Sequence, residues 1–158
     1  MVSLYNELIH AGLNVSKIIT NKENENYEIL FNSYYLVVYS YLEGNQIGWD
    51  SQYRKLNKEL ISKIAIELRN FHNATCKENV FNLPNLPFED NDCIERKCVL
   101  HFDLTRNNIL INQKNNKVGI IDFDDAKYGS AIYDIAIIVA NLFFSKTYGV
   151  DINGAKIF

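Results

Sequence analysis

Oxygen-bearing side chains whose spacing could support phosphoryl transfer lie in two short segments of the chain. The first has the form His-x-Asp-x-x-x-x-Asn and contains His101, Asp103 and Asn108, and the second places Asp122 after an apolar run. Transfer of a phosphoryl group from a nucleotide needs a carboxylate at the acceptor hydroxyl and oxygen ligands that hold Mg²⁺ against the phosphates. Asp103 fits the first role, and Asn108 and Asp122 fit the second.

A short β-hairpin is expected between the two segments. The strand-like runs 109–111 and 118–121 flank a polar turn at 114–116. Such a hairpin would bring the three oxygen-bearing side chains to one crevice. We expect His101 to hold the loop through hydrogen bonds rather than to transfer a proton.

Hydrophobic spacing predicts that helices and a strand pair surround these segments. Apolar residues at helical spacing, with Gly12 as the stop, predict a short helix over 3–11. The other expected elements are strands over 27–31 and 34–41 joined around 32–33, a helix over 51–72, a helix over 131–146 and the start of another at 154–158. The helix over 131–146 is expected to be buried through Ile132, Ile135, Val139 and Leu142.

The composition limits the class of protein. The chain has 158 residues, 47% of them hydrophobic, which is enough for one domain or most of one. The net charge of −3, with no cluster of Lys and Arg, argues against a nucleic-acid partner. Three cysteines without Cys-x-x-Cys spacing favour reduced thiols in the cytoplasm over a zinc site. No apolar run has the length of a membrane span or a signal peptide, so no membrane partner is expected.

The segment from His101 to Ala136 resembles the catalytic core of the aminoglycoside phosphotransferase family. That family includes choline and homoserine kinases and is related to the protein kinases. Its pattern is a His-Gly-Asp-Leu-x-x-x-Asn-like loop, a hairpin, Ile-Asp-Phe and then Tyr-Asp-Leu-Ala. The matching residues are His101-Phe102-Asp103-Leu104, Asn108, Ile121-Asp122-Phe123 and Tyr133-Asp134-Ile135-Ala136. Phe102 stands where the family usually has Gly, which we expect to be tolerated, and Asp134 resembles an aspartate that braces the catalytic loop.

Upstream, the segment 37–44 (Val-Val-Tyr-Ser-Tyr-Leu-Glu-Gly) resembles the strand and hinge between the two lobes of this family. The resemblance implies that the backbone of Ser40 and Leu42 bonds the adenine edge and that Tyr39 forms a wall of the pocket. An ordinary strand that ends at the glycine is the alternative. His72, at a helix end that resembles the family's, is expected to be structural.

The resemblance implies a protein-kinase-like α+β fold. Residues 1–44 would form an incomplete N-terminal lobe and hinge, and residues 45–158 a mainly helical C-terminal lobe that carries the catalytic hairpin. ATP and Mg²⁺ would be the cofactors, with Asp103 as the catalytic residue and Asn108 and Asp122 as the metal ligands. The implied reaction transfers the γ-phosphoryl group to a hydroxyl of a small molecule, such as an aminoglycoside antibiotic, which would make the protein a resistance enzyme.

The chain also departs from the family pattern. No Gly-rich loop and no strand lysine for the phosphates precede the first helix, and the family's acceptor-binding helices have no counterpart. We therefore expect a truncated member, with a free edge on the strand over 34–41. A non-catalytic remnant or pseudokinase is the alternative. A protein kinase is disfavoured, because Tyr133-Asp134 follows Asp122 too closely for a peptide-docking segment. The acidic run 89–95 could attract a polycationic substrate or be an ordinary solvated loop.

Overall fold

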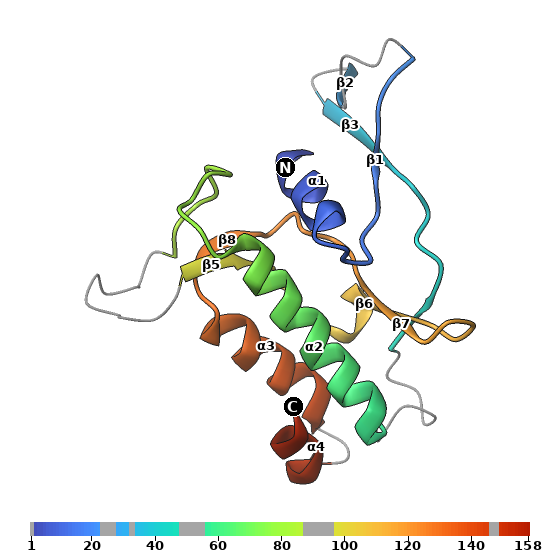
Figure 1. Cartoon of the computed structure of the whole chain (residues 1–158), viewed down its shortest axis with the longest axis vertical. Helices are drawn as coiled ribbons and strands as arrows, with labels where there is room; N and C mark the ends of the chain where they lie inside the picture. The colour runs from blue at the N-terminus through green and yellow to red at the C-terminus, as the bar shows by residue number, and fades with distance from the viewer. Residues whose placement is uncertain (1, 23–27, 32–33, 48–55, 87–96, 146–148) are drawn as a thin grey trace.

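The computed structural model describes residues 2–22, 28–31, 34–47, 56–86, 97–145 and 149–158. Three sequence predictions lie outside these ranges: the turn at 32–33, residues 51–55 of an expected helix, and the acidic run 89–95. Figure 1 shows helix α1 and a small sheet toward one end of the molecule, a long helix through its centre, and the C-terminal helices toward the opposite end. This mixture of helix and sheet agrees with the predicted fold class.

An antiparallel sheet of three strands forms the N-terminal end of the molecule (Figure 1). Its strands are β1 (Ile18–Ile19), β2 (Glu28–Phe31) and β3 (Tyr34–Tyr39), in the order β1-β3-β2. The predicted pairing of 27–31 with 34–41 is confirmed. Among the described residues, β1 pairs only with Val38 and Tyr39, so one edge of β3 is free over its first four residues. This agrees with the expectation of a free edge on the strand over 34–41. Leu36, one of these four residues, is 54% exposed.

Helix α1 (Val2–His10) confirms the short helix predicted over 3–11. It ends in a Schellman motif, in which the Leu13 N–H donates to the Leu8 carbonyl and the Gly12 N–H donates to the Ile9 carbonyl, each over 3.0 Å. Gly12 has a φ of +82°, a conformation that glycine adopts without steric cost. The apolar face of the helix packs into the core.

Helix α2 (Lys58–Thr75) crosses the centre of the molecule and contacts α1, α4, β5 and β7 (Figure 1). Asn57 is its N-cap: the backbone there is extended, and the side chain accepts a hydrogen bond of 2.8 Å from the Leu60 N–H. The helix therefore begins later than the predicted start at 51 and continues past the predicted end at 72. Its buried residues recur every three or four positions and are Ile61, Ile64, Leu68, Phe71 and Thr75.

Two groups of short antiparallel strands hold the segment that contains the candidate site. Strands β6 (Ile109–Asn112) and β7 (Lys117–Ile120) form the predicted hairpin, and β4 (Asn45–Gln46) pairs with β6. Strand β5 (Lys97–Leu100) leads into the catalytic-loop segment and pairs with β8 (Lys127–Ser130). Strand β8 is not predicted by the sequence, because its four residues show no apolar alternation.

The C-terminal helices are α3 (Ile132–Phe143) and α4 (Ile152–Ile157), with the short paired strands β9 (Phe144–Ser145) and β10 (Gly149–Val150) between them in the chain. The predicted helix over 131–146 thus ends early, and its predicted buried face is wrong in part. Leu142 is buried, but Ile132 is 49% and Ile135 is 38% exposed. Asp134 is buried instead, because its carboxylate bonds the catalytic loop, and this turns Ile132 and Ile135 outward. None of the described helices is long and apolar enough to cross a membrane.

Gly12→Ala should lower the free energy of unfolding by about 1 kcal/mol, because a side chain is strained at this positive φ. The strain is purely conformational, since no atom lies within 4 Å of the added Cβ. Urea denaturation of the two proteins measures the difference. Gly12→Asn is the matched control and should lose less, because asparagine tolerates the left-handed region better. An alanine variant as stable as the wild type would contradict the assignment of Gly12 as the helix-terminating residue.

Candidate active site

Asp103 and Asn108 lie in direct contact in the loop that follows β5. The Asn108 amide Nδ2 donates to Asp103 Oδ2 over 2.8 Å and to the Asp103 backbone carbonyl over 2.9 Å. A 3₁₀ turn (Arg106–Asn108) returns the chain toward Asp103 and allows this contact. Asn108 is buried and Asp103 is half-buried. Both hydrogen bonds use the amide nitrogen, so the amide oxygen of Asn108 is not committed to Asp103.

Asp122 lies beside this pair because the backbone of Ile121 bonds that of Asn108. The Ile121 N–H donates to the Asn108 carbonyl over 3.0 Å, which extends the β6–β7 pairing by one step. Asp122 itself is exposed. The structure therefore places Asp103, Asn108 and Asp122 at the same end of one hairpin, and their chemical roles stay predictions.

His101 is fully buried and links the loop to the residue before Asp122. Its Nε2 lies 2.8 Å from the Ile121 carbonyl oxygen, and its Nδ1 lies 3.3 Å from the Asp103 backbone nitrogen. A neutral ring with its proton on Nε2 satisfies both contacts, because a carbonyl only accepts and a backbone N–H only donates. His101 therefore has the loop-holding position expected from the sequence.

The carboxylate of Asp134 braces the loop from α3. It is fully buried, and it accepts hydrogen bonds from the N–H groups of His101 and Phe102 and from His72 Nε2, each over 2.9 Å. A buried carboxylate without partners would be strongly disfavoured, so these three donors allow it to stay in the interior. The bracing position expected for Asp134 is confirmed. The bond from His72 was missed, because nothing in the sequence around His72 indicates its partner.

Phe102 has a φ of +65°, in the left-handed region. For a residue with a side chain this conformation costs about 1 to 2 kcal/mol, whereas glycine adopts it freely. The expectation that Phe102 is tolerated in place of glycine stays a prediction, and the left-handed backbone means that the replacement carries this cost. Two features offset it: the bond from the Phe102 N–H to Asp134, and the contact of the Phe102 side chain with the buried cluster of Leu86, Cys98 and Leu100.

Arg106 anchors the 3₁₀ turn, and the sequence analysis did not single it out. Its side chain is buried, and its guanidinium donates from Nε to the Asn141 carbonyl over 3.0 Å and from Nη2 to the Leu142 carbonyl. Those carbonyls lie in the last turn of α3, where the helix dipole favours a positive charge. Burial lowers the pKa of Arg106 from its ordinary value, but a guanidinium stays charged at neutral pH.

A cavity of about 620 Å³ lies between α1, the N-terminal sheet and the end of β7. All three residues predicted to bind the nucleotide, Tyr39, Ser40 and Leu42, line it. Asp122 and Asp124 line it as well, whereas no lysine or arginine among the described residues does. The cavity thus combines the predicted hinge with carboxylates that suit a divalent cation.

The backbone of the hinge-like segment is only partly available to a ligand. The Ser40 N–H donates to the Lys17 carbonyl over 2.7 Å, and the Ser40 hydroxyl accepts from the Lys17 N–H over 2.8 Å. Because the Ser40 N–H is already bonded, the Ser40 carbonyl is the backbone group of this residue that an adenine edge could bond. Leu42 packs where Gly119 of β7 leaves room, since a Cβ on Gly119 would lie 2.7 Å from Leu42 Cδ2. This close approach packs the hinge-like segment against the β6–β7 hairpin.

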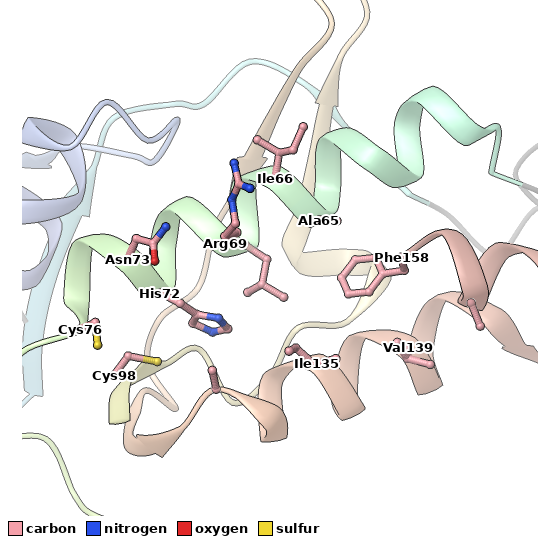
Figure 2. A pocket seen from close by; sticks show the side chains of 13 residues that line it. Ala65, Ile66, Arg69, His72, Asn73, Cys76, Cys98, Ile135, Val139 and Phe158 are labelled. Carbon is pink, nitrogen blue, oxygen red and sulfur yellow. The ribbon is translucent and has the colours of Figure 1, made fainter. Parts of the chain in front are cut away.

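A second hollow, of about 560 Å³, lies between α2, α3 and α4 (Figure 2). Figure 2 shows Ile135 of α3 and Phe158 near its wall, and the His72 ring pointing into it from α2. His72 is the link to the catalytic loop, because its Nε2 bonds Asp134. None of the predicted site residues lines this hollow, so we place the candidate active site in the first cavity.

Comparison with protein-family models matches one segment of the chain. Residues 82–155 match the model of the phosphotransferase enzyme family, APH. The matched segment, somewhat less than half of the chain, includes Asp103, Asn108 and Asp122, whereas the hinge-like residues lie outside it. Comparison with curated proteins finds no significant match.

Solved structures show that the chain has the predicted protein-kinase-like fold. The amicoumacin kinase hAmiN, in complex with AMP-PNP, Ca²⁺ and Ami, is similar with a TM-score of 0.73 and 17% identity over 89% of this chain. GDP complexes of a mutant and of wild-type aminoglycoside 2′-phosphotransferase-IIIa are similar with TM-scores of 0.66 and 0.58 and identities of 17% and 15%, each over 89% of this chain. The chain covers 51%, 59% and 60% of these three structures, so it spans between half and three fifths of their length.

Asp134→Ala should lower the free energy of unfolding by about 3 kcal/mol, because it leaves two backbone N–H groups and His72 without their acceptor in the interior. Chemical denaturation measures the loss. His72→Leu is the matched comparison: leucine has no donor, so this variant removes only one of the three donors and should cost about 1 kcal/mol. If Asp134→Ala were as stable as the wild type, Asp134 would not be the brace of the loop.

Proposed function

We propose that the protein transfers a phosphoryl group from ATP to a hydroxyl group of a small molecule. The observation that carries this proposal is the contact of Asp103 with Asn108 beside Asp122, within the segment that matches the phosphotransferase family. A carboxylate next to oxygens that suit a metal ion is the arrangement that orients an acceptor hydroxyl toward a metal-bound phosphate.

Asp103 acts on the acceptor. Its Oδ2 is held by the Asn108 amide, which limits the orientations of the carboxylate, and its half-buried position keeps it accessible to a substrate. The carboxylate orients the acceptor hydroxyl and accepts its proton as the new oxygen–phosphorus bond forms. The bond between the γ-phosphorus of ATP and its bridging oxygen breaks at the same time, and ADP leaves. Because phosphoryl transfer depends chiefly on positioning and electrostatics, a carboxylate fixed by its neighbour suits this task.

Mg²⁺ would be held by the Asn108 amide oxygen and the Asp122 carboxylate. Hard divalent cations prefer oxygen ligands, and this donor set supplies them. Asp122 lines the cavity, and the hydrogen bonds between Asn108 and Asp103 leave the amide oxygen of Asn108 uncommitted to Asp103. When bound, the ion neutralises charge on the phosphates.

ATP would occupy the cavity with its adenine against residues 39–42. The Ser40 carbonyl and the Leu42 backbone meet the adenine edge, and the Tyr39 ring forms a wall. The neighbours in fold were solved with AMP-PNP or GDP, so GTP is the appropriate competitor in a binding assay.

We infer that the acceptor is a hydroxyl-bearing antibiotic or a similar metabolite. The support is the fold, whose neighbours are an amicoumacin kinase and an aminoglycoside phosphotransferase. An ATP-dependent activity of this kind would act in the cytoplasm and give antibiotic resistance. Neither a nucleic acid nor a membrane is part of this proposal.

A non-catalytic nucleotide-binding module is the second candidate. It is favoured by one observation, the lack of a lysine or arginine among the described residues that line the cavity, because kinases use a lysine on the phosphates. A phosphorylation screen of amino sugars, choline and homoserine with the 158-residue chain separates the two functions: ATP-dependent transfer to any of them supports the enzyme, and nucleotide binding without transfer supports the module. Because no lysine or arginine among the described residues lines the cavity, we expect any transfer to be well below the rate of about 1 per second or more that complete kinases show.

Asp122→Ala should abolish the increase in ATP affinity that Mg²⁺ produces, because it removes the charged ligand of the proposed metal site. Calorimetric titration with ATP, with and without Mg²⁺, measures this increase. Asp125→Ala is the matched control, because Asp125 is an exposed carboxylate nearby that does not line the cavity. A full Mg²⁺ response in Asp122→Ala would contradict the assignment.

Asp103→Asn should lower the rate of phosphoryl transfer at least a hundredfold and leave ATP affinity nearly unchanged. An interaction made chiefly in the transition state has this signature. The rate is measured on whichever acceptor the screen identifies, and the affinity by titration. A large loss of ATP affinity with the transfer rate preserved would count against Asp103 as the residue that acts on the acceptor.

A further inference from the structure

We propose that Arg106 is a positioning residue for Asn108: by tying the turn of the catalytic loop to α3, it holds the proposed metal ligand in place. This rests on the function proposed above. Arg106 lies between Asp103 and Asn108 in the sequence, where a cation could face the phosphates of a nucleotide. Its side chain is instead 5% exposed and does not line the cavity. The effect of Arg106 on the site must therefore pass through the structure of the loop.

The guanidinium of Arg106 supplies donors that the end of α3 needs. An α-helix leaves its last carbonyls without N–H partners of its own, so other groups must bond them. Arg106 donates from Nε to the Asn141 carbonyl over 3.0 Å and from Nη2 to the Leu142 carbonyl. The Asp151 N–H donates to the next carbonyl, that of Phe143, over 2.8 Å. Because the guanidinium is planar and forked, two bonds to neighbouring carbonyls fix its direction as well as its position.

The catalytic loop is attached to α3 on both sides of Asp103. Before Asp103, two consecutive backbone N–H groups donate to Asp134 in the first turn of α3. After Asp103, Arg106 bonds the last turn of the same helix. Asp134 and Asn141 are seven residues apart in the helix, which is about 10 Å along its axis. Two attachments to one rigid helix fix the loop at both ends, whereas the first alone would leave the part after Asp103 free to turn.

The turn that Arg106 holds determines where the Asn108 amide lies. Arg106 begins the 3₁₀ turn, and Asn108 ends it. Within the turn, the Asn108 N–H donates to the Thr105 carbonyl over 3.1 Å, a local bond that keeps the shape of the turn but does not fix the turn against the rest of the molecule. The attachment to α3 supplies that fixed point.

Loss of the Arg106 donors would release Asn108. The turn could then shift as a unit, and the two bonds from the Asn108 amide to Asp103, of 2.8 and 2.9 Å, would be made for less of the time. The Asn108 amide oxygen would spend less time beside Asp122, where a metal ion needs both ligands together. Contacts with the adenine would be unaffected, because Arg106 does not line the cavity.

The test is Arg106→Met in the whole chain, which keeps an unbranched apolar stem and removes the donors. ATP is titrated calorimetrically in the presence and absence of Mg²⁺. We expect the affinity in Mg²⁺ to fall about tenfold, in keeping with the loss of one charge-assisted hydrogen bond, and the affinity without metal to change less than twofold. A residue that only supported folding would not produce this difference between the two titrations. Unchanged affinity in Mg²⁺ for folded Arg106→Met overturns the proposal.

Arg106→Lys keeps the proposal testable where Arg106→Met does not fold. Lysine keeps the charge but lacks the fork, so it can bond one of the two carbonyls, and we expect the affinity in Mg²⁺ to fall about threefold. If Arg106→Met does not fold, a wild-type affinity in Arg106→Lys overturns the proposal. Asp151→Ala is the matched control: it removes the bond from the Gly154 N–H to Asp151 Oδ1, which caps α4 beside α3, and should change neither affinity. A loss in this control as large as in Arg106→Met would show that loosening the helix ends is sufficient, and would overturn the proposal.

Hydrogen exchange of backbone amides separates this proposal from the proposed function. The Asn108 N–H is bonded inside the turn, whereas the Ile120 N–H donates to the Asn14 carbonyl outside it over 3.3 Å. In the Arg106 variants, exchange at Asn108 should be about tenfold faster with exchange at Ile120 nearly unchanged, which is local opening of the turn. Equal acceleration at both amides, or none at Asn108, overturns the proposal. If the wild type shows no Mg²⁺-dependent ATP binding, the proposed function fails, and the exchange measurement still decides whether Arg106 holds the turn.

Discussion

The buried carboxylate of Asp134 is the constraint on which the catalytic loop depends. A charged group in the interior needs donors, and it obtains two from consecutive backbone N–H groups and one from His72 at the end of α2. Two consecutive N–H groups can point at one acceptor only if the chain leaves the extended conformation, and the positive φ of Phe102 achieves this. The same turn directs the chain to Asp103. The position of the candidate catalytic carboxylate therefore follows from the need to satisfy another carboxylate that takes no part in the chemistry.

Left-handed backbone occurs at Phe102 and Asp122, on either side of the candidate site. Each such residue costs of order 1 to 3 kcal/mol and persists only where its surroundings hold it. The surroundings here are hydrogen bonds from different elements: Asp134 of α3 holds Phe102, and His101 holds the carbonyl before Asp122. Because His101 also bonds Asp134 through its N–H, the two strained positions share one residue. A disturbance at either position would reach the other through His101.

The sequence predicted the parts of the fold that neighbouring residues determine. The helix ended by Gly12 and the hairpin of β6 and β7 depend on local turn chemistry and apolar spacing. The convergence of Asp103, Asn108 and Asp122 on one crevice stays a prediction, since of the three only Asp122 lines the cavity. The errors arose where a residue that is distant in the sequence determines which side chains of a helix are buried or where the helix ends. The inward face of α3 is set by the bond from Asp134 to the loop, and the last turn of α3 is bonded by Arg106. Neither partner can be read from the periodicity of the helix itself.

The electrostatics of the cavity link the metal to the nucleotide. Among the described lining residues, Asp122 and Asp124 bring negative charge and no lysine or arginine offsets it. A nucleotide triphosphate is itself strongly anionic, so its phosphates are repelled from these carboxylates unless a divalent cation lies between them. In the proposed function, the hinge-like residues would bind the adenine without the ion, because they contribute uncharged groups. We therefore infer that the adenine end determines which nucleotide binds, whereas the metal determines whether its phosphates approach Asp103.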